Sequence, residues 1–214
     1  MNDTALTLGL HGLPGTGKDT LADYLVDKHG FTKVAFADRL KRELARIFNE
    51  PMCTFTVRAG KTEPSPFLRY SRCNYYPFIR FLLKRAHEAG ESKFDADAPR
   101  TPRFMMQQYG DFCREHNPNY FIETVEQVIR ETEGHVVVTD VRFPNERDAV
   151  KFFPRSYIIE VTRANNPYCE NGDKHASNAM LSPQMVDCAI GNDGEPDVMY
   201  EAIERILKSF VESA

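Results

Sequence analysis

Short apolar runs alternate along this chain with segments whose apolar positions recur at helical spacing. The runs at residues 5–10, 33–37, 136–139 and 157–161 have the length and apolar character of buried strands. Residues 19–29, between the first two runs, carry an apolar stripe on one helical face. Strands separated by helices predict an α/β fold in which a parallel sheet is flanked by helices.

Further helices and one short strand complete the predicted order. The pattern predicts helices at residues 38–49, 78–89, 102–115, 118–133, from 145 onward and at 196–210, and a strand at 188–190. Asp38 is the predicted N-cap of the first of these helices. Residues 51–76 are expected to be irregular and residues 90–102 to form a polar loop. We expect a single domain over residues 1–214, with an excursion at 51–102.

A glycine-rich turn separates the first run from the first helix. It reads Gly12-Leu13-Pro14-Gly15-Thr16-Gly17-Lys18-Asp19-Thr20, which meets the spacing G-x-x-x-x-G-K. In this context the backbone N–H groups and the helix start bind phosphate oxygens, while Lys18 reaches the terminal phosphates. An ordinary Gly/Pro turn is the alternative. The residues expected to bind a nucleotide are Leu13, Gly15, Thr16, Gly17, Lys18, Asp19 and Thr20.

The position after the lysine departs from the usual pattern. A Ser or Thr hydroxyl there ordinarily binds Mg²⁺, whereas this chain has Asp19 and places Thr20 one residue later. Either Asp19 helps to hold the metal, directly or through water, or the loop is not catalytic.

Composition narrows the class of protein. The 214 residues carry a net charge of −4, so we expect no global basic field for binding a nucleic-acid polymer. The five cysteines form no C-x-x-C pair, which argues against a disulfide framework or zinc site and favours a reducing, cytoplasmic setting. No signal peptide or apolar run long enough for a bilayer is expected. The oligomeric state, including a homodimer, stays open.

Two acidic residues follow predicted strands on the side where parallel sheets bind ligands. Asp38 follows the second apolar run and Asp140 follows the run at 136–139. Asp140 could bind Mg²⁺ through water or accept a hydrogen bond from an acceptor nucleotide. A helix cap or a partner for Arg142 is the competing interpretation.

Four motifs together resemble one known family. They are the loop ending Gly17-Lys18-Asp19-Thr20, the stretch AFADRLK at 35–41, RFMMQQYG at 103–110 and TDVRFPNE at 139–146. Over nearly the whole chain these resemble the bacteriophage deoxynucleoside monophosphate kinases, within the P-loop nucleoside monophosphate kinase group. The tail is also similar, at His175-Ala176-Ser177-Asn178 and in the Asp187–Gly194 element, although Asn178 replaces the expected Glu.

The resemblance implies a P-loop NTPase-type sheet with a mobile lid at residues 162–182 and a helical acceptor-binding excursion at 51–102. It implies transfer of the γ-phosphoryl group of ATP, with Mg²⁺, to a deoxynucleoside 5′-monophosphate, giving ADP and a dNDP. Both partners are small molecules. Two alternatives stay open: a P-loop kinase of another small phosphate, such as phosphomevalonate or dephospho-coenzyme A, and a nucleotide-binding switch without an acceptor.

The candidate site residues follow from this comparison and from residue chemistry. The expected catalytic residues are Lys18, Asp140 and Arg142, and the expected metal ligands are Asp19 and Asp140. Arg163 is expected to contact ATP from the lid. The acceptor is expected to contact Asp38, Lys41, Arg69, Arg72, Gln108, Asp140, Arg142, Asn145, Glu146 and Lys174. For most of these a structural role competes: an ion pair of Arg142 with Asp140 or Glu146, a helix start at Asn145 and Glu146, or a solvated surface for the others.

Overall fold

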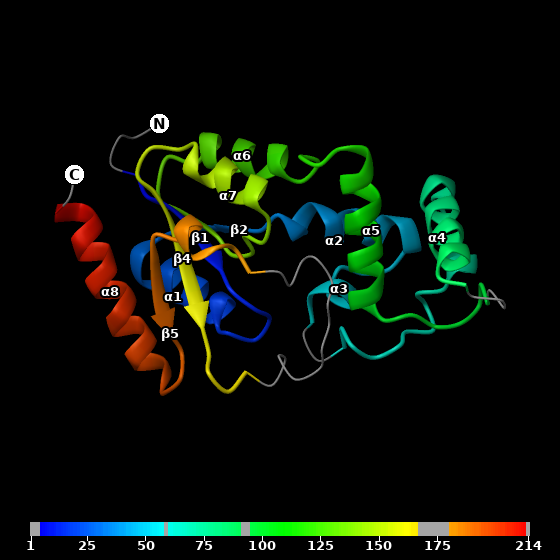
Figure 1. Cartoon of the computed structure of the whole chain (residues 1–214), viewed down its shortest axis with the longest axis horizontal. Helices are drawn as coiled ribbons and strands as arrows, with labels where there is room; N and C mark the ends of the chain where they lie inside the picture. Colours follow the sequence, from blue (N-terminus) through cyan, green and yellow to red (C-terminus); the bar gives the residue numbers. More distant parts are fainter. Residues whose placement is uncertain (1–4, 58–59, 91–94, 167–179, 213–214) are drawn as a thin grey trace. The chain divides into compact units, whose positions relative to one another are not determined.

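A computed structural model describes residues 5–57, 60–90, 95–166 and 180–212 of the chain. The chain divides into two compact units (Figure 1). One, which we call the sheet unit, comprises Met1–Phe36 and Ile122–Ala214, and the other, the helical unit, comprises Ala37–Phe121. The expected excursion at 51–102 lies wholly inside the helical unit. A single domain over the whole chain stays a prediction.

The sheet unit is built on five parallel strands. They are β1 (Thr7–His11), β2 (Thr32–Val34), β3 (Val136–Val138), β4 (Ser156–Thr162) and β5 (Cys188–Gly191). Their order is β2-β3-β1-β4-β5, so β1 occupies the centre (Figure 1). Thr7 pairs with Val136 on one side and with Ser156 on the other. The predicted α/β fold with a parallel sheet is confirmed.

Successive side chains of a strand point to opposite faces of the sheet, so both faces present apolar groups that helices cover. Leu8 and Leu10 of β1 pack in a buried cluster with Leu21 and Leu25 of α1 (Lys18–His29) and Ile203 of α8 (Pro196–Glu212). Gly9, between these two leucines, faces the opposite side of the sheet. A Cβ atom on Gly9 would meet Ile158, Val141 and Val150, the last of these on α7 (Pro144–Lys151). α6 (Ile122–Glu131) packs beside α7.

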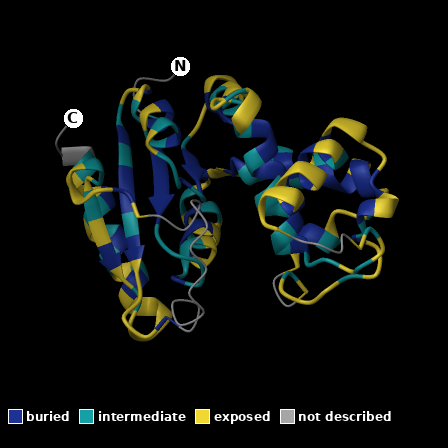
Figure 2. Cartoon of the chain, turned by 45° about the vertical axis from the view of Figure 1, so that its right-hand side comes forward, coloured by how far each residue is buried: buried dark blue, intermediate teal, exposed yellow. Residues whose placement is uncertain are grey.

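The helical unit has an apolar core of its own. It contains α2 (Ala37–Phe48), α3 (Cys53–Thr56), the 3₁₀ turn η1 (Tyr70–Arg72), α4 (Tyr76–Glu88) and α5 (Pro102–His116). Phe78 of α4 packs edge-on against Tyr109 of α5, with ring centroids 5.0 Å apart. Thr101 caps α5 by accepting a hydrogen bond from the N–H of Phe104 at 3.0 Å. Figure 2 shows buried residues on the inner faces of these helices.

Three local predictions differ from the structure. α6 begins at Ile122 rather than at residue 118, because Asn117 closes a turn by accepting bonds from the N–H groups of Asn119 and Tyr120. β2 ends at Val34 and α2 begins at Ala37, so Asp38 lies in the first helical turn and is not the N-cap. The stretch 51–76 contains α3 and η1 and is not wholly irregular.

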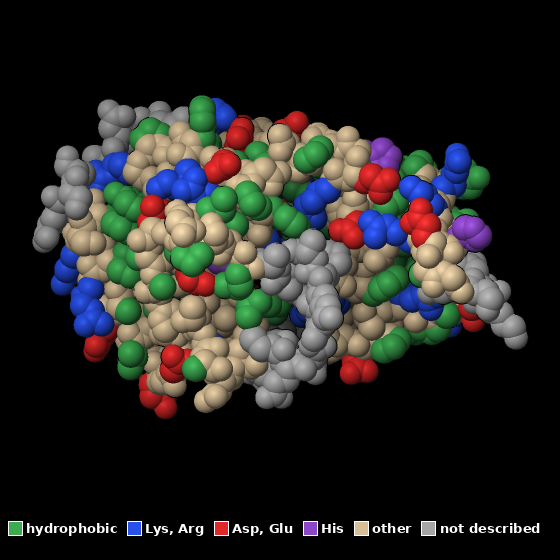
Figure 3. All heavy atoms as spheres, viewed as in Figure 1, with side chains coloured by type: hydrophobic (Ala, Val, Ile, Leu, Met, Phe, Trp, Pro, Cys, Tyr) green, Lys and Arg blue, Asp and Glu red, His purple; other side chains and the backbone are tan. Residues whose placement is uncertain are grey.

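Surface charge is mixed. On the face drawn in Figure 3, acidic and basic side chains are interspersed, in keeping with the net charge of −4. None of the helices in the described ranges has the length and apolar character that crossing a membrane would require.

Candidate functional site

The glycine-rich turn between β1 and α1 has a backbone that glycine alone adopts readily. Gly12, Gly15 and Gly17 have φ values of +135°, +85° and +104°. Thr16 is buried, and its hydroxyl donates to the carbonyl oxygen of Leu13 at 3.0 Å, which closes the turn. α1 begins at Lys18, directly after this turn. A turn of this kind followed by a helix N-terminus is a strong anion-binding arrangement.

Lys18 folds back onto the same turn. Its Nζ donates to the carbonyl oxygens of Gly12 and Leu13, both at 2.7 Å. These bonds hold the ammonium group at the turn. A cation in this position can bind phosphate oxygens placed against the loop N–H groups.

Asp19 carries a solvent-exposed carboxylate. Its side chain is 83% exposed, and Oδ1 lies 3.5 Å from Nζ of Lys33 on β2. The same ammonium donates to Asp23 at 2.8 Å. Within the described ranges no three His, Cys, Asp or Glu side chains gather as a metal cluster. Mg²⁺ does not need one, since it is commonly held by one or two carboxylates, water and the phosphates of a substrate.

Two asparagine side chains attach the glycine-rich loop to the segments that follow β4 and β5. Asn166, after β4, donates from Nδ2 to the carbonyl oxygen of Pro14 at 2.8 Å. Asn192, after β5, donates from Nδ2 to the carbonyl oxygen of Thr16 at 2.8 Å. The Asn192 amide lies where a Cβ atom on Gly17 would stand. Sequence reasoning assigned neither asparagine to the loop, although Asn192 belongs to the tail element that the resemblance marked.

Asp140 joins the ends of two neighbouring strands. Its Oδ1 accepts a hydrogen bond at 2.7 Å from the N–H of Phe36, just beyond β2. The next residue, Val141, donates from its N–H to the carbonyl oxygen of Leu10 in β1 at 3.1 Å. The half-buried carboxylate of Asp140 therefore lies at the carboxyl edge of the sheet, where parallel sheets bind ligands.

Glu146 has a structural role at the start of α7. It is 2% exposed, and Oε2 accepts from the N–H groups of Arg142 at 2.8 Å and Phe143 at 3.2 Å. This is the helix-start role that the sequence left open. The half-buried side chains of Arg142 and Asn145 lie in the same turn. Binding of the acceptor by these three residues stays a prediction.

The remaining described acceptor candidates belong to the helical unit. Arg69 is half-buried, and its Nε is enclosed without a hydrogen-bond acceptor among the described residues. Arg72 instead lies 3.8 Å from the carboxylate of Glu50. Asp38 is engaged by Lys41, with the two charged atoms 3.0 Å apart. Gln108 is half-buried on α5, so it is not wholly solvent-facing.

A polar node in the helical unit escaped the sequence analysis. Glu43 of α2 accepts from the hydroxyls of Tyr109 at 3.0 Å and Tyr120 at 2.9 Å, and from Nε of Arg39 at 3.0 Å. Burial raises the pKa of Tyr109 well above its usual range. Arg39 and Tyr109 come from two of the motifs that carry the resemblance, so Glu43 joins these two motifs in the structure.

The proposed lid is described only at its two flanks. Arg163 is exposed, and the neighbouring Ala164 donates from its N–H to Asp193 at 2.6 Å. Lys174 and His175 lie outside the described residues. Their predicted roles stay predictions.

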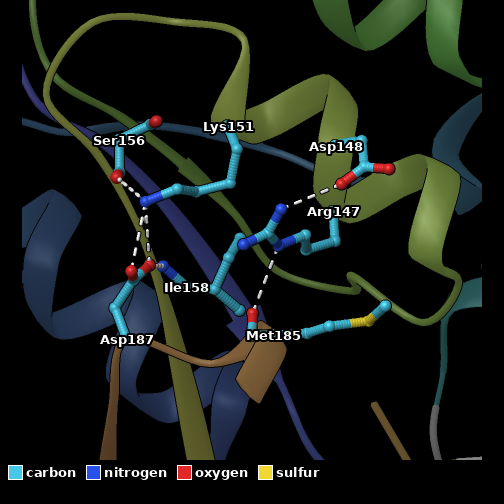
Figure 4. Close-up of polar contacts among 7 residues, drawn as sticks. All are labelled: Arg147, Asp148, Lys151, Ser156, Ile158, Met185 and Asp187. Atoms are coloured by element: carbon cyan, nitrogen blue, oxygen red, sulfur yellow. Dashed lines mark hydrogen bonds and ion pairs between the residues drawn. The ribbon is translucent and has the colours of Figure 1, made fainter. Parts of the chain in front are cut away.

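The segment that leads into β5 is firmly attached to β4 and α7. Asp187 accepts from the N–H of Ile158 at 2.6 Å and from Nζ of Lys151 at 3.1 Å (Figure 4). Arg147 of α7 donates to the carbonyl oxygen of Met185 at 3.3 Å. The first residue of the tail element, Asp187, therefore has a structural role.

Known proteins similar to this chain carry the name of the family that its motifs resemble. The chain is 27% identical over 213 residues to a protein of Acanthamoeba polyphaga mimivirus provisionally named deoxynucleotide monophosphate kinase, covering 92% of this chain and 93% of that one. It is 25% identical over 243 residues to the deoxynucleotide monophosphate kinase of Escherichia phage RB69, covering 93% and 98%. The predicted resemblance to viral deoxynucleotide monophosphate kinases is thereby confirmed. No protein-family model matches the chain.

Solved structures are more distant. A dephospho-CoA kinase from Campylobacter jejuni aligns over 100% of both chains with 13% identity and a TM-score of 0.45. A gluconokinase from Sinorhizobium meliloti aligns over 100% of this chain and 95% of its own, with 11% identity and a TM-score of 0.40. The fold class rests on the strand order and pairing of this chain itself.

Proposed function

We propose that this protein is a Mg²⁺- and ATP-dependent kinase that transfers the γ-phosphoryl group of ATP to the 5′-phosphate of a deoxynucleoside monophosphate. The products are ADP and a dNDP. The observation that carries the proposal is the Gly12–Lys18 turn, whose left-handed glycines and retained lysine stand at the start of α1. The two viral relatives support the acceptor class, and they also favour a host-cytoplasm setting.

The loop supplies most of the binding to ATP in this proposal. Its N–H groups and the start of α1 bind the β- and γ-phosphates, and Lys18 exchanges the carbonyls of Gly12 and Leu13 for phosphate oxygens. Asn166 and Asn192 keep the loop in shape without using its N–H groups. The acceptor phosphate is itself the nucleophile, so catalysis depends on placement and positive charge.

Asp19 and Asp140 are the residues that would hold Mg²⁺. Both are carboxylates beside predicted phosphate-binding elements, one exposed and one half-buried, which suits a metal that retains water and phosphate ligands. The metal supplies neutralisation of charge between the phosphates. Lys33, 3.5 Å from Asp19, limits the local negative charge.

In this proposal an arginine side chain binds the phosphate of the acceptor. Arg69 offers an enclosed Nε without an acceptor in the described part of the chain, and a guanidinium can bind a phosphate through two parallel hydrogen bonds. Arg142, beside Asp140, is the second candidate in this proposal. Leaving a buried donor without a partner is costly, which favours an anion as its missing partner.

The direct test is a product assay. Purified protein is incubated with MgATP and, separately, with dGMP, dTMP, dCMP, dAMP, GMP, AMP, dephospho-coenzyme A and phosphomevalonate, and the products are separated by ion-exchange chromatography. Diphosphate formed from deoxynucleotides supports the proposal. Transfer only to one of the last two acceptors would replace it with another P-loop kinase. Binding of ATP without any transfer would favour a switch.

Asp140→Asn is expected to lower kcat roughly tenfold, the loss of one charged hydrogen bond or metal contact. The asparagine retains an oxygen that can accept from the N–H of Phe36, so the folded structure should persist. Steady-state kinetics across Mg²⁺ concentrations measure the effect. Asp148→Asn, at an exposed α7 carboxylate, is the control and should leave kcat unchanged. An unchanged kcat in Asp140→Asn removes this carboxylate from the reaction.

Arg69→Gln is expected to raise KM for the acceptor roughly tenfold and to leave KM for ATP unchanged, because it removes a charged hydrogen bond to one substrate only. Initial rates with each substrate varied in turn distinguish the two constants. Arg80→Gln, at an exposed arginine of α4 in the same unit, serves as the matched control. An equal rise in both KM values would show a structural rather than an acceptor-binding role.

A further inference from the structure

A buried histidine stands immediately before the phosphate-binding turn. His11 is the last residue of β1 and is 1% exposed. Its Nδ1 lies 2.9 Å from the carbonyl oxygen of Val141, and its Nε2 lies 3.1 Å from the backbone nitrogen of Leu181. A backbone N–H can only donate and a carbonyl can only accept. The ring must therefore be neutral, with its proton on Nδ1.

The first of these bonds fixes the turn that carries two proposed catalytic residues. Val141 lies between Asp140 and Arg142 in sequence. Its N–H donates to Leu10 at 3.1 Å, and its carbonyl accepts from His11. Both polar backbone groups of Val141 are thus attached to the last two residues of β1, which lead directly into Gly12.

The second bond holds the chain that returns toward β5. Leu181 is buried and donates to His11, while farther along Met185 and Asp187 are attached to α7 and β4 (Figure 4). His11 therefore connects three parts of the sheet unit: the start of the loop, the turn after β3 and Leu181. The two hydrogen bonds of its ring span 130 and 170 residues of sequence.

The groups around the ring shift the pKa of His11 in both directions. Burial is the largest influence and lowers the pKa of His11 below its usual 6.5, while Lys18 and Arg142 lower it further. The Val141 carbonyl and Glu160, which pairs with His11 in the β1–β4 register, act in the opposite direction. The net result agrees with the neutral ring that the hydrogen bonds require.

We propose that His11 is a positioning residue for phosphoryl transfer: its neutral ring, bonded to Val141 and Leu181, holds the Asp140–Arg142 turn in register with the phosphate-binding loop. This rests on the proposed kinase function. His11 touches no substrate in this role and acts through Val141. Displacing reacting groups by about an ångström can cost up to a hundredfold in rate, so such an attachment matters to turnover.

Two amide substitutions separate the two bonds. Asn places its Nδ2 where Nδ1 stands, so His11→Asn can retain the bond to Val141 and loses the bond to Leu181. His11→Gln places an oxygen near the Nε2 position and does the reverse. We expect kcat to fall about tenfold in His11→Gln and by less than about threefold in His11→Asn, with KM for ATP similar in both. Equal kcat losses would overturn the assignment to Val141.

His135 provides the matched control. Its ring is half-buried and accepts a bond from the N–H of Leu6 at 2.9 Å, next to the amino end of β1 rather than the carboxyl end. His135→Gln, which carries no acceptor at the Nδ1 position, should lower the unfolding midpoint without changing kcat. If it lowers kcat as much as His11→Gln does, the effect is general destabilisation and the positioning role is wrong.

A spectroscopic measurement does not depend on activity. Ring ¹⁵N shifts of the intact protein at neutral pH should show His11 with a protonated Nδ1 and an unprotonated Nε2. The other tautomer or a cation would overturn the inference even in an active kinase. If the wild-type protein phosphorylates no acceptor, the proposed function fails, and that failure appears in the parent chain rather than in the His11 variants.

Discussion

Lys18→Met is expected to lower kcat for phosphoryl transfer by about a thousandfold, the upper range for removing one preorganised charge from a transition state. Methionine retains much of the unbranched side chain but cannot bind phosphate. Two hydrogen bonds of Lys18 are to carbonyl oxygens of the loop itself, so we expect the sheet to be unaffected. Stopped assays with MgATP and the preferred dNMP measure the loss.

Lys28→Met is the control for that experiment, because it removes an exposed lysine from the last turn of the same helix. Its kcat should equal that of the parent chain, and thermal unfolding should show that both variants are folded. Should Lys18→Met retain more than about a third of the parent kcat, the loop would not bind the transferred phosphate, and the kinase proposal would lose its main support.

Local patterns predicted the elements of this fold well, for a physical reason. Strands β1, β3 and β4 are short, largely apolar runs and most helices carry apolar stripes, and both signals reside in neighbouring residues. The signal for β2 was weaker, since only Val34 of its three residues is buried. The order of the strands could not be obtained in this way. β3 lies between β2 and β1 although about a hundred residues separate it from β2, and this insertion depends on packing across the whole sheet. Likewise, the start of α6 depended on the turn that Asn117 forms.

In the candidate site, too, local features could be predicted from the sequence and long-range contacts could not. The loop was identifiable because its glycines and lysine have a fixed spacing. The contacts that hold it were not, since Asn192 bonds to Thr16 across 176 residues and His11 bonds to Leu181 across 170. Glu146 shows what burial adds to the sequence: its 2% exposure and its two backbone donors show that it fills a helix-start role, while its contact with the acceptor stays a prediction.

Gly17→Ala is expected to destabilise the protein by about 2 kcal/mol and to lower kcat/KM for ATP about a hundredfold. Gly17 has a φ of +104°, a region that L-residues rarely adopt. A methyl group there also meets the amide of Asn192, which is bonded to Thr16. Relieving either conflict moves the loop N–H groups away from the phosphates. Chemical denaturation and steady-state kinetics measure the two effects.

The double variant Gly17→Ala, Asn192→Ala separates the two causes. Removing the Asn192 amide relieves the collision but leaves the φ strain and gives up the bond to Thr16. If the collision dominates, the double variant should be less impaired than the sum of the single variants, which is a coupling that a double-mutant cycle measures. Gly134→Ala, where a Cβ atom would meet nothing within 4 Å, should be neutral. A Gly17→Ala variant that binds ATP like the parent would mean that the loop does not need its present backbone to hold phosphate.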